Sequence, residues 1–286
     1  MMSNCREKLL LDVGGTFIKC SDGRQIPIDS DGPFESIAGS LSSAVSDFCR
    51  DETVKEKSIA VAIPGPFDYN EGRFLMTHKF ASVYGRLFRD IAGVPDSVDM
   101  VFCHDVVAML KGELKCGSGA GFNRVALITL GTGLGFAVSI DGKILLKPQG
   151  SPSTSIYSMP YGNGILEDYV SKRGILSEYA SLGRSAETVK EISDRAKAGE
   201  EEAIVAFLRA GTHLAECIAP VLNEYSIECL LFGGQISRSF NLMAPELKRE
   251  LQPCRSLKRI SAVSDIDNAT FNGLESIIYT LTPYCR

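Results

Sequence analysis

Two patterns of apolar and polar positions alternate along the chain. Short apolar runs bounded by glycine or charged residues predict buried strands, and apolar residues repeated every three or four positions predict amphipathic helices. The predicted strands are residues 8–13, 17–21, 58–63, 98–103, 124–130, 136–140, 143–146, 229–232 and 257–262. The predicted helices are residues 35–50, 84–92, 105–114, 165–170, 186–198, 200–225, 240–251 and 268–281. Because strands and helices alternate, the sequence predicts an α/β fold.

One local pattern occurs twice, which indicates an internal duplication. A strand, a turn containing glycine and threonine, and a second strand follow one another near residues 8–21 and again near residues 124–140. Self-similarity of this kind is typical of a fold built from two related halves. A glycine-rich stretch at residues 117–121 separates the halves, so we place the boundary there.

Composition and charge exclude several classes of protein. The chain has 286 residues, of which 44% are hydrophobic and 23% charged, as in globular proteins. The formal net charge is -5. Proteins that bind nucleic acids usually carry a basic surface, so a nucleic-acid partner is not expected. No apolar run approaches the roughly 20 residues that span a bilayer, and residues 1–11 lack a signal-peptide pattern. We therefore expect a cytoplasmic protein without a membrane partner.

The cysteines indicate reduced thiols. Nine are scattered along the chain and no two form a C-x-x-C pair, so neither a disulfide framework nor a structural zinc site is expected. Only three histidines are present, which leaves little material for a histidine-rich metal site. Mostly buried, reduced thiols are the remaining interpretation.

The first glycine turn carries candidate chemistry. Gly14 and Gly15 follow a predicted strand, and glycines in such a turn let backbone N–H groups approach an anion. Thr16 adds a hydroxyl donor, and Asp12 can hold a hydrated Mg²⁺ that bridges phosphate oxygens. A plain hairpin turn with a capping aspartate is the alternative interpretation. Lys19 either points at the same phosphates or is an exposed strand lysine.

Two further glycine clusters resemble ligand loops. Residues 131–135 read Gly-Thr-Gly-Leu-Gly, but the third glycine of a dinucleotide fingerprint is replaced by Phe136 and a strand follows, so a phosphate-binding hairpin fits better. No G-x-x-x-x-G-K-[ST] motif is present. Gly233 and Gly234 lie where a predicted strand meets a helix, a place that attracts anions or admits a flat base.

Asp105 is the candidate general base. It follows His104 at the end of a predicted strand and begins a helix. A carboxylate at the carboxyl end of a strand faces the region where α/β proteins bind ligands, and it can accept a proton from a substrate hydroxyl. A helix N-cap is the alternative, and such caps are common.

The order of these motifs resembles the sugar kinases of the ROK family, within the actin/hexokinase/Hsp70 superfamily. The motifs are Asp12-x-Gly14-Gly15-Thr16, Pro64-Gly65-Pro66, His104-Asp105, Leu130-Gly131-Thr132-Gly133 and Gly233-Gly234. The resemblance covers residues 8 to about 282. It implies two RNase-H-like domains on either side of a central cleft. These are residues 1–117, completed by the helix at 268–286, and residues 118–267.

The resemblance also implies roles for individual residues. Asp105 is the implied base for a sugar hydroxyl that attacks the γ-phosphate of ATP, and Asp12 holds Mg²⁺ through water. The implied ATP phosphate and adenosine contacts are Gly14, Gly15, Thr16, Lys19, Gly131, Thr132, Gly133, Gly233 and Gly234. The implied sugar contacts are Gly65, His78, His104 and Glu167. The alternative for Glu167 is a first-turn helix glutamate favoured by the helix dipole.

The sugar half departs from the family pattern. His104 replaces the usual asparagine before the base, and residues 77–80, Thr-His-Lys-Phe, replace the usual Asn-Leu contact. The glutamate–histidine sugar motif has no clear counterpart in residues 150–158, and the zinc-binding cysteines are replaced by residues 160–164. His78 and His104 are either substitute hydrogen-bond donors or simply packed or exposed residues.

The leading hypothesis is an ATP- and Mg²⁺-dependent kinase acting on a hexose or hexose derivative, with a homodimer as a reasonable assembly. A non-catalytic sugar-binding regulator of the same fold and a stand-alone ATPase are the alternatives. ROK-type repressors carry an N-terminal DNA-binding domain. We expect none here, because the first predicted strand begins near residue 8.

Overall fold

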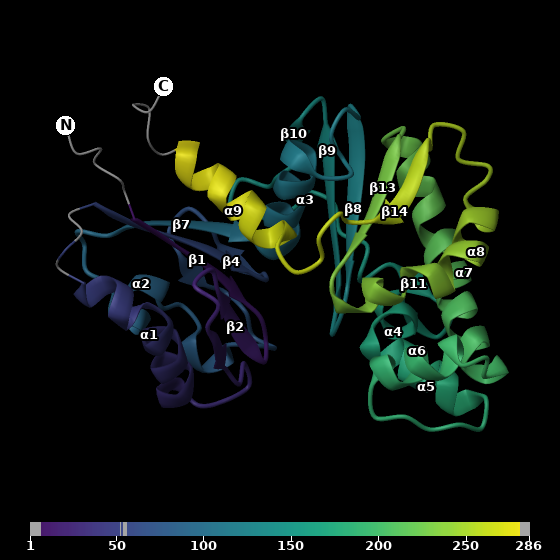
Figure 1. Ribbon diagram of the computed structural model, residues 1–286, viewed down its shortest axis with the longest axis horizontal. Coiled ribbons are helices and arrows are strands. Elements are labelled where there is room, and N and C mark those ends of the chain that lie inside the picture. Colours follow the sequence, from purple (N-terminus) through teal and green to yellow (C-terminus); the bar gives the residue numbers. More distant parts are fainter. Residues whose placement is uncertain (1–6, 52, 54–55, 281–286) are drawn as a thin grey trace. The chain divides into compact units, whose positions relative to one another are not determined.

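The structure is a computed structural model, and it describes residues 7–51, 53 and 56–280. The chain divides into two compact units (Figure 1). Unit 1 holds the residues up to Gly112, the short segment Leu146–Ser151 and the residues from Asn268 onward. Unit 2 holds Glu113–Leu145 and Pro152–Asp267.

A five-stranded sheet forms the centre of unit 1. Its strands, in spatial order, are β3 (Gln25–Pro27), β2 (Phe17–Cys20), β1 (Glu7–Val13), β4 (Lys57–Ile63) and β7 (Asp99–His104). Strands β1, β4 and β7 are parallel, whereas β2 is antiparallel to both of its neighbours. All seven residues of β4 are buried, as expected for an inner strand of a sheet covered on both faces. A short hairpin of β5 (Phe67–Asp68) and β6 (Arg73–Phe74) follows β4.

Helices cover both faces of this sheet. Helix α1 (Phe34–Arg50) and helix α2 (Phe88–Ala92) pack on one face, and α9 (Ala269–Thr280) contacts β1 and β4 from the other (Figure 1). A 3₁₀ turn, η1 (Ala81–Val83), precedes α2, and α3 (Asp105–Cys116) follows β7 directly. The apolar period of α1 is as predicted, because Ile37, Leu41 and Val45 are all fully buried.

Helices α3 and α9 cross at two glycines. A β-carbon at Gly273 would lie 1.7 Å from the Ala108 carbonyl oxygen, and one at Gly112 would lie 2.3 Å from the Ala269 carbonyl oxygen. Neither distance is compatible with a side chain, so the two backbones approach as closely as glycine alone permits.

Unit 2 repeats the sheet of unit 1. Its strands, in spatial order, are β10 (Lys143–Ile144), β9 (Leu134–Ile140), β8 (Arg124–Leu130), β13 (Cys229–Gly233) and β14 (Arg259–Ala262). Here β8, β13 and β14 are parallel, and β9 is antiparallel to both of its neighbours. The matching order and directions confirm the duplication that the two glycine–threonine turns indicate. A hairpin of β11 (Pro160–Tyr161) and β12 (Gly164–Ile165) lies outside this sheet.

The helices of unit 2 enclose its core. They are α4 (Glu167–Val170), α5 (Lys172–Ser181), α6 (Val189–Lys197), α7 (Glu201–Glu224), the 3₁₀ helix η2 (Gln235–Ser239) and α8 (Phe240–Glu250). By length and composition α7 is apolar enough to cross a membrane. Its buried side chains, including Phe207, Leu214 and Ile218, belong to the core of unit 2, which accounts for that composition.

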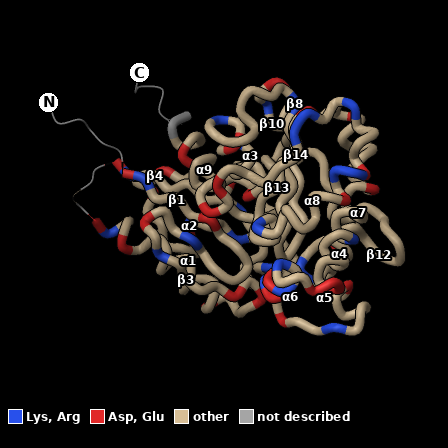
Figure 2. Tube along the Cα trace, turned by 45° about the vertical axis from the view of Figure 1, so that its right-hand side comes forward, with Lys and Arg blue, Asp and Glu red and all other residues tan. Residues whose placement is uncertain are grey.

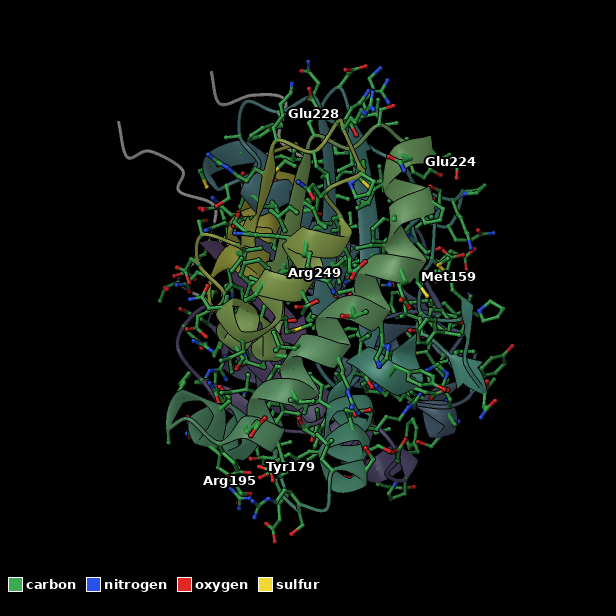
Figure 3. All side chains as sticks on the ribbon, turned by 90° about the vertical axis from the view of Figure 1, so that its right-hand side faces the viewer. Met159, Tyr179, Arg195, Glu224, Glu228 and Arg249 are labelled. Carbon is green, nitrogen blue, oxygen red and sulfur yellow. The ribbon has the colours of Figure 1, made fainter. Side chains whose placement is uncertain are left out.

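Polar contacts order the outer helices of unit 2. Acidic and basic residues lie side by side on α6 (Figure 2), where Lys190 and Asp194 form an i,i+4 ion pair at 2.6 Å. Arg195 of the same helix donates to the Tyr179 hydroxyl of α5 at 2.8 Å (Figure 3). The hydroxyl of Thr188 caps α6 by accepting from the Glu191 N–H at 3.1 Å.

Some predicted elements differ from the structure. The predicted helix at 84–92 is shorter and begins at Phe88, and the one at 165–170 begins at Glu167 because residues 164 and 165 pair in the β11–β12 hairpin. Helix α5 was not predicted, since Gly174 weakens its helical pattern. A β-carbon there would lie 2.3 Å from the Tyr169 carbonyl carbon, so close packing on α4 requires glycine.

The described cysteines form no disulfide with one another, and five of the seven are buried: Cys20, Cys103, Cys217, Cys229 and Cys254. Most of the described thiols are therefore buried, as the sequence predicts, and their reduced state stays a prediction. Cys5 and Cys285 lie outside it.

Candidate functional site

The candidate residues of unit 1 gather at one edge of its sheet. Strands β1, β4 and β7 are parallel, so their carboxyl ends meet at the same edge. Asp12 pairs with Ala62 near the end of β4, and Ile63 pairs with His104, the last residue of β7. Asp12, the loop after β4 and Asp105 are therefore neighbours through the register of the strands.

The first glycine turn joins β1 to β2. The Gly14 N–H donates to the Phe17 carbonyl at 2.9 Å, and the Gly15 carbonyl accepts from the Ser30 N–H at 3.1 Å. Within the described residues, the N–H groups of Gly15 and Thr16 donate to no acceptor. Thr16 is exposed. The turn thus has free donors of the kind that bind anions.

Asp12 lies at the end of β1, opposite Lys19 in the β1–β2 register. Burial, together with the negative charge of Asp105, raises its pKa from 3.8 to about 6, and the positive charge of Lys19 opposes that rise. The ionised form of Asp12 is therefore destabilised in the folded protein. A cation bound beside it would relieve this cost.

Asp105 begins α3 with its carboxylate close to His104. Its Oδ1 atom lies 2.6 Å from the His104 Nδ1 and accepts from the Val106 N–H, also at 2.6 Å. Burial works to raise the pKa, but His104, the Val106 N–H and the charge of Lys79 outweigh it and hold the pKa of Asp105 below 3.8. The side chain is 39% exposed, so an ionised carboxylate is open to a ligand.

This geometry differs from that of an ordinary N-cap. A capping side chain accepts from the N–H two or three residues further along, whereas Asp105 accepts from the N–H of the next residue. Among the described residues, no hydrogen bond of the usual capping kind supports the alternative, and the role of Asp105 as a base stays a prediction.

The loop after β4 brings Gly65 against His104. A β-carbon at Gly65 would lie 3.3 Å from the Tyr69 hydroxyl and 3.5 Å from the His104 ring. Tyr69 is anchored by its hydroxyl, which donates to the Ile63 carbonyl at 3.0 Å. Gly65 and His104 thus share the sheet edge with Asp105. His78 is exposed on the loop that follows β6.

The second glycine turn joins β8 to β9 in unit 2. The Gly131 N–H donates to the Gly133 carbonyl at 3.0 Å, and the Gly131 carbonyl accepts from the Lys172 N–H at 2.9 Å. Thr132 at the tip is exposed. The start of α5 therefore holds this turn through its backbone.

Glu167 lies against the same turn. Its Oε2 accepts from the Leu134 N–H at 2.9 Å and would be 3.0 Å from a β-carbon at Gly133. Its Oε1 accepts from Arg173 at 3.0 Å. Both carboxylate oxygens thus have protein partners within unit 2. No sequence motif indicates Arg173 as a partner of Glu167, and a contact between Glu167 and sugar stays a prediction.

Gly233 ends β13 and Gly234 follows it, at the same sheet edge as the second turn. Gly233 pairs with Thr129 of β8, and Gly234 has a φ of +81°. A β-carbon at Gly234 would lie 2.4 Å from the Leu130 carbonyl oxygen. Both the conformation and the close approach therefore require glycine, and the backbone beside the second turn is left bare.

The β11–β12 hairpin occupies residues 160–165, which include the segment that stands in place of the family's zinc-binding cysteines. The Tyr161 hydroxyl donates to the Glu216 carboxylate at 2.5 Å and lies 2.6 Å from the His213 Nδ1. The Tyr161 ring packs edge-on against Tyr169. Aromatic packing and the hydrogen bonds of the Tyr161 hydroxyl hold the hairpin on α7.

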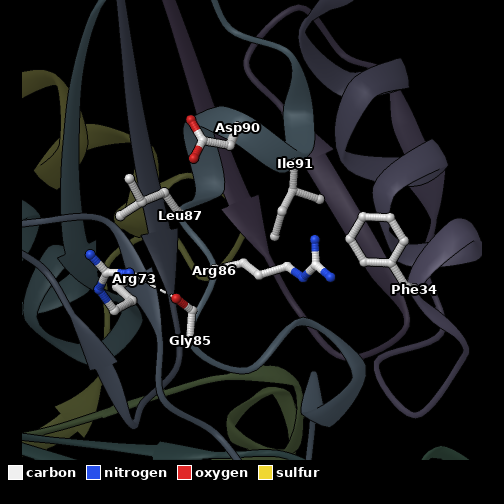
Figure 4. A pocket seen from close by; sticks show the side chains of 7 residues that line it. All are labelled: Phe34, Arg73, Gly85, Arg86, Leu87, Asp90 and Ile91. Carbon is white, nitrogen blue, oxygen red and sulfur yellow. Dashed lines mark hydrogen bonds between the residues drawn. The ribbon is translucent and has the colours of Figure 1, made fainter.

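A cavity of about 340 Å³ lies elsewhere in unit 1 (Figure 4). The Arg86 guanidinium stacks 4.5 Å above the Phe34 ring at its wall, and Arg73 donates to the Gly85 carbonyl at 2.7 Å. Leu87, Asp90 and Ile91 complete the lining. None of the predicted site residues lines this cavity.

Sequence reasoning missed Lys79. A β-carbon at Gly15 would lie 4.0 Å from its Nζ atom, and its charge acts on Asp105. A lysine in a loop between short elements carries no local pattern, and only the folded chain brings it to the first turn.

Comparison with known proteins identifies the family. The sequence matches the ROK family over residues 9–153 and 161–273. It is 24% identical over 256 residues to the N-acetylmannosamine kinase of Escherichia coli (strain SMS-3-5 / SECEC), covering 82% of this chain and 85% of that one.

Two solved structures share the fold. A ROK family glucokinase from Streptomyces griseus, in complex with glucose and AMPPNP, matches with a TM-score of 0.75 and 20% identity over 94% of this chain and 98% of that one. A ROK family transcriptional regulator, a homologue of the E. coli MLC protein, matches with a TM-score of 0.77 and 18% identity over 96% and 78%. The predicted α/β fold of the actin-like ATPase type is thereby confirmed, and the chain belongs to the ROK family.

Proposed function

We propose that the protein transfers the γ-phosphoryl group of ATP to a hydroxyl of a hexose or hexose derivative. The observation that carries the proposal is the sheet edge of unit 1. There an ionised, accessible Asp105 lies in the same group of residues as a glycine turn with free N–H donors. The family and its relatives named as sugar kinases support the same reaction.

In the proposed reaction the sugar hydroxyl oxygen attacks the γ-phosphorus. A new oxygen–phosphorus bond forms, and the bond between the γ-phosphorus and the β–γ bridging oxygen breaks. The electron pair of the broken bond stays on the β-phosphate of ADP, and the hydroxyl proton passes to the Asp105 carboxylate. A carboxylate whose pKa is held low is ionised at neutral pH and ready to accept that proton. Transfer of this kind depends mainly on positioning and on charge neutralisation.

Asp12 fits the requirements of a Mg²⁺ site. Mg²⁺ is commonly held by one or two carboxylates, by waters and by substrate phosphates. Asp12 is a partly buried carboxylate whose ionisation is costly, and Asp105 supplies a second carboxylate beside it, so the pair meets this description. The metal would neutralise phosphate charge, and Asp12 would hold it through water.

The ATP contacts follow from the glycine turns. We assign the phosphates to Gly14, Gly15 and Thr16 with Lys19, and to residues 131–133 of the second turn. The bare backbone at Gly233 and Gly234 is assigned to the adenosine. The proposal requires both turns to bind one triphosphate.

The sugar side is assigned to Gly65, His78, His104 and Glu167. Glu167 already holds the second turn and Arg173, so a sugar contact requires it to share an oxygen. Glucose and N-acetylmannosamine are the first substrates to test, because similar proteins are named glucokinase and N-acetylmannosamine kinase. A cytoplasmic location and a homodimer belong to the same proposal.

Sugar-dependent ADP release is the test. The purified protein is incubated with ATP, Mg²⁺ and a panel of hexoses that includes glucose and N-acetylmannosamine. We expect one sugar to drive ADP release and to become phosphorylated, as detected by mass spectrometry. Asp105→Asn should lose about 10²–10⁴-fold in kcat while it still binds ATP. Full activity of that variant would exclude Asp105 as the base.

A non-catalytic regulator is the second candidate, because a ROK family transcriptional regulator shares the fold. Sugar binding without ADP release in the panel would favour it. ADP release that no sugar stimulates would instead favour a stand-alone ATPase.

A further inference from the structure

Lys79 is fixed beside the first glycine turn by its neighbours. The Ser30 N–H donates to the Gly15 carbonyl at 3.1 Å, and the Ser30 carbonyl accepts from the Phe80 N–H at 2.6 Å. Ser30 is itself buried, so it connects the turn to the loop that carries Lys79. The Ser82 hydroxyl donates to the Gly32 carbonyl at 2.9 Å and holds the same two loops together.

The residue after Lys79 has an unusual backbone. Phe80 has a φ of +53° and a ψ of +26°, the left-handed region, although it is not glycine. Such a conformation costs about 1 kcal/mol and persists where the surroundings impose it. The Phe80 side chain is fully buried, and the centroids of the Phe80 and Phe74 rings are 5.5 Å apart. This packing imposes the left-handed backbone at Phe80. The position of the Lys79 backbone is thus determined by a buried anchor.

The Lys79 ammonium has no ion-pair or hydrogen-bond partner in the part of the chain that the structure describes. Its side chain is nevertheless half-buried. A partly desolvated charge is unfavourable unless an opposite charge compensates for it. An anionic ligand would supply the missing partner.

Two neighbours of Lys79, Gly15 and Asp105, indicate which anion the ammonium binds. A β-carbon at Gly15 would lie 4.0 Å from the Lys79 Nζ, so the ammonium lies beside the turn assigned to the phosphates. Its charge also acts on Asp105, the proposed base. In an in-line transfer, the γ-phosphoryl group passes from the β-phosphate to the hydroxyl that the base deprotonates. It therefore lies between the phosphate-binding turn and the base. We propose that the Lys79 ammonium binds the γ-phosphoryl group of ATP and stabilises its charge during transfer.

This inference rests on the proposed function. It predicts that loss of the Lys79 charge weakens the binding of AMP-PNP but not of ADP. AMP-PNP has a γ-phosphoryl group and ADP has none. Calorimetry with Mg²⁺ should therefore show that Lys79→Met binds AMP-PNP at least about tenfold more weakly than the wild type, while ADP affinity is unchanged. Lys79→Arg should retain most of the AMP-PNP affinity, because it keeps the charge. Equal losses for both nucleotides, or no loss, would overturn the proposal.

Turnover gives the second readout. Loss of one preorganised charge contact to a transition state typically lowers kcat about 10²–10³-fold. We expect Lys79→Met to lower kcat in this range with little change in the KM of the sugar. A rise in sugar KM with kcat retained would place Lys79 on an anionic group of the sugar instead, and so would contradict the assignment.

The pH profile separates this role from a structural one. Asp105 is faced by His104 and Cys103 from β7, by Asp12 from β1, by Tyr69 from the loop after β5 and by Lys79 from the loop after β6. Removing the Lys79 charge should raise the pKa of Asp105 and move the acid limb of kcat/KM to higher pH. Lys111→Met is the matched control, since Lys111 is a half-buried lysine of unit 1 whose charge acts on Cys103. It should leave nucleotide binding and the profile unchanged.

Failure of the proposed function is distinguishable from failure of this assignment. If no sugar supports turnover by the wild type, the kinase proposal fails, but the comparison of AMP-PNP with ADP still decides whether Lys79 binds the terminal phosphoryl group. Thermal unfolding of each variant shows whether the fold is retained.

Discussion

Asp12 offers a direct test of the electrostatics of the sheet edge. Burial and the Asp105 charge raise its pKa from 3.8 to about 6 in the folded protein. The unfolded chain has the ordinary value, so between these two pKa values the native state binds the proton more tightly. The free energy of unfolding therefore falls as the pH rises from about 4 to about 6. Above that pH, the ionised Asp12 lowers it by at most about 3 kcal/mol.

Asp12→Asn removes this titration. The linkage relation predicts that the free energy of unfolding of the variant, relative to the wild type, increases by about 1.4 kcal/mol between about pH 5 and about pH 7.5. Urea unfolding followed by circular dichroism suits the chain, which has no tryptophan. The transition that unfolds unit 1 is the one to analyse, because Asp12 belongs to that unit.

Asp105→Asn provides the internal control. It removes the negative charge that contributes to the shift, so the pKa of Asp12 should fall toward its ordinary value and the pH dependence should shrink. A stability difference between Asp12→Asn and the wild type that does not change with pH would refute the reasoning. A difference that decreases with rising pH would refute it as well.

Three further predictions concern packing and the second turn. Gly273→Ala places a β-carbon 1.7 Å from the Ala108 carbonyl oxygen. It should lower the melting temperature strongly, with a loss of about 3 kcal/mol or more. Gly39→Ala, inside α1 with open space around it, should instead stabilise by about 0.5–1 kcal/mol, and equal effects of the two variants would contradict the close crossing. Glu167→Ala removes the acceptor of the Leu134 N–H, so the KM for ATP should rise while Asp105-dependent chemistry is retained. An unchanged KM for ATP would show that this contact does not order the turn.

The main strands and both glycine turns could be predicted from sequence, because their signals are local. Apolar runs that end in Gly14 and in Gly131 mark the two strand–turn–strand units, and the structure pairs them as hairpins. His104 and Asp105 were also recognisable, since a strand ends and a helix begins between them.

The contacts that depend on folding could not be predicted in this way. Lys79 reaches Gly15 because Ser30 and the buried Phe80 hold two loops together, and nothing in residues 77–80 indicates this. The β5–β6 and β11–β12 hairpins have strands of two residues, too short for a periodic pattern. The pairing of Glu167 with Arg173 likewise joins side chains that no motif connects.

The central claim is that the glycine turn of each unit binds the same triphosphate. A crystal structure with AMP-PNP, Mg²⁺ and the activating sugar tests it most directly. We predict backbone contacts from Gly15 and from Thr132 to phosphate oxygens of one nucleotide, with the Lys79 ammonium on the γ-phosphoryl group and the sugar hydroxyl at Asp105. A triphosphate bound by one turn alone, with the other turn away from it, would contradict the account.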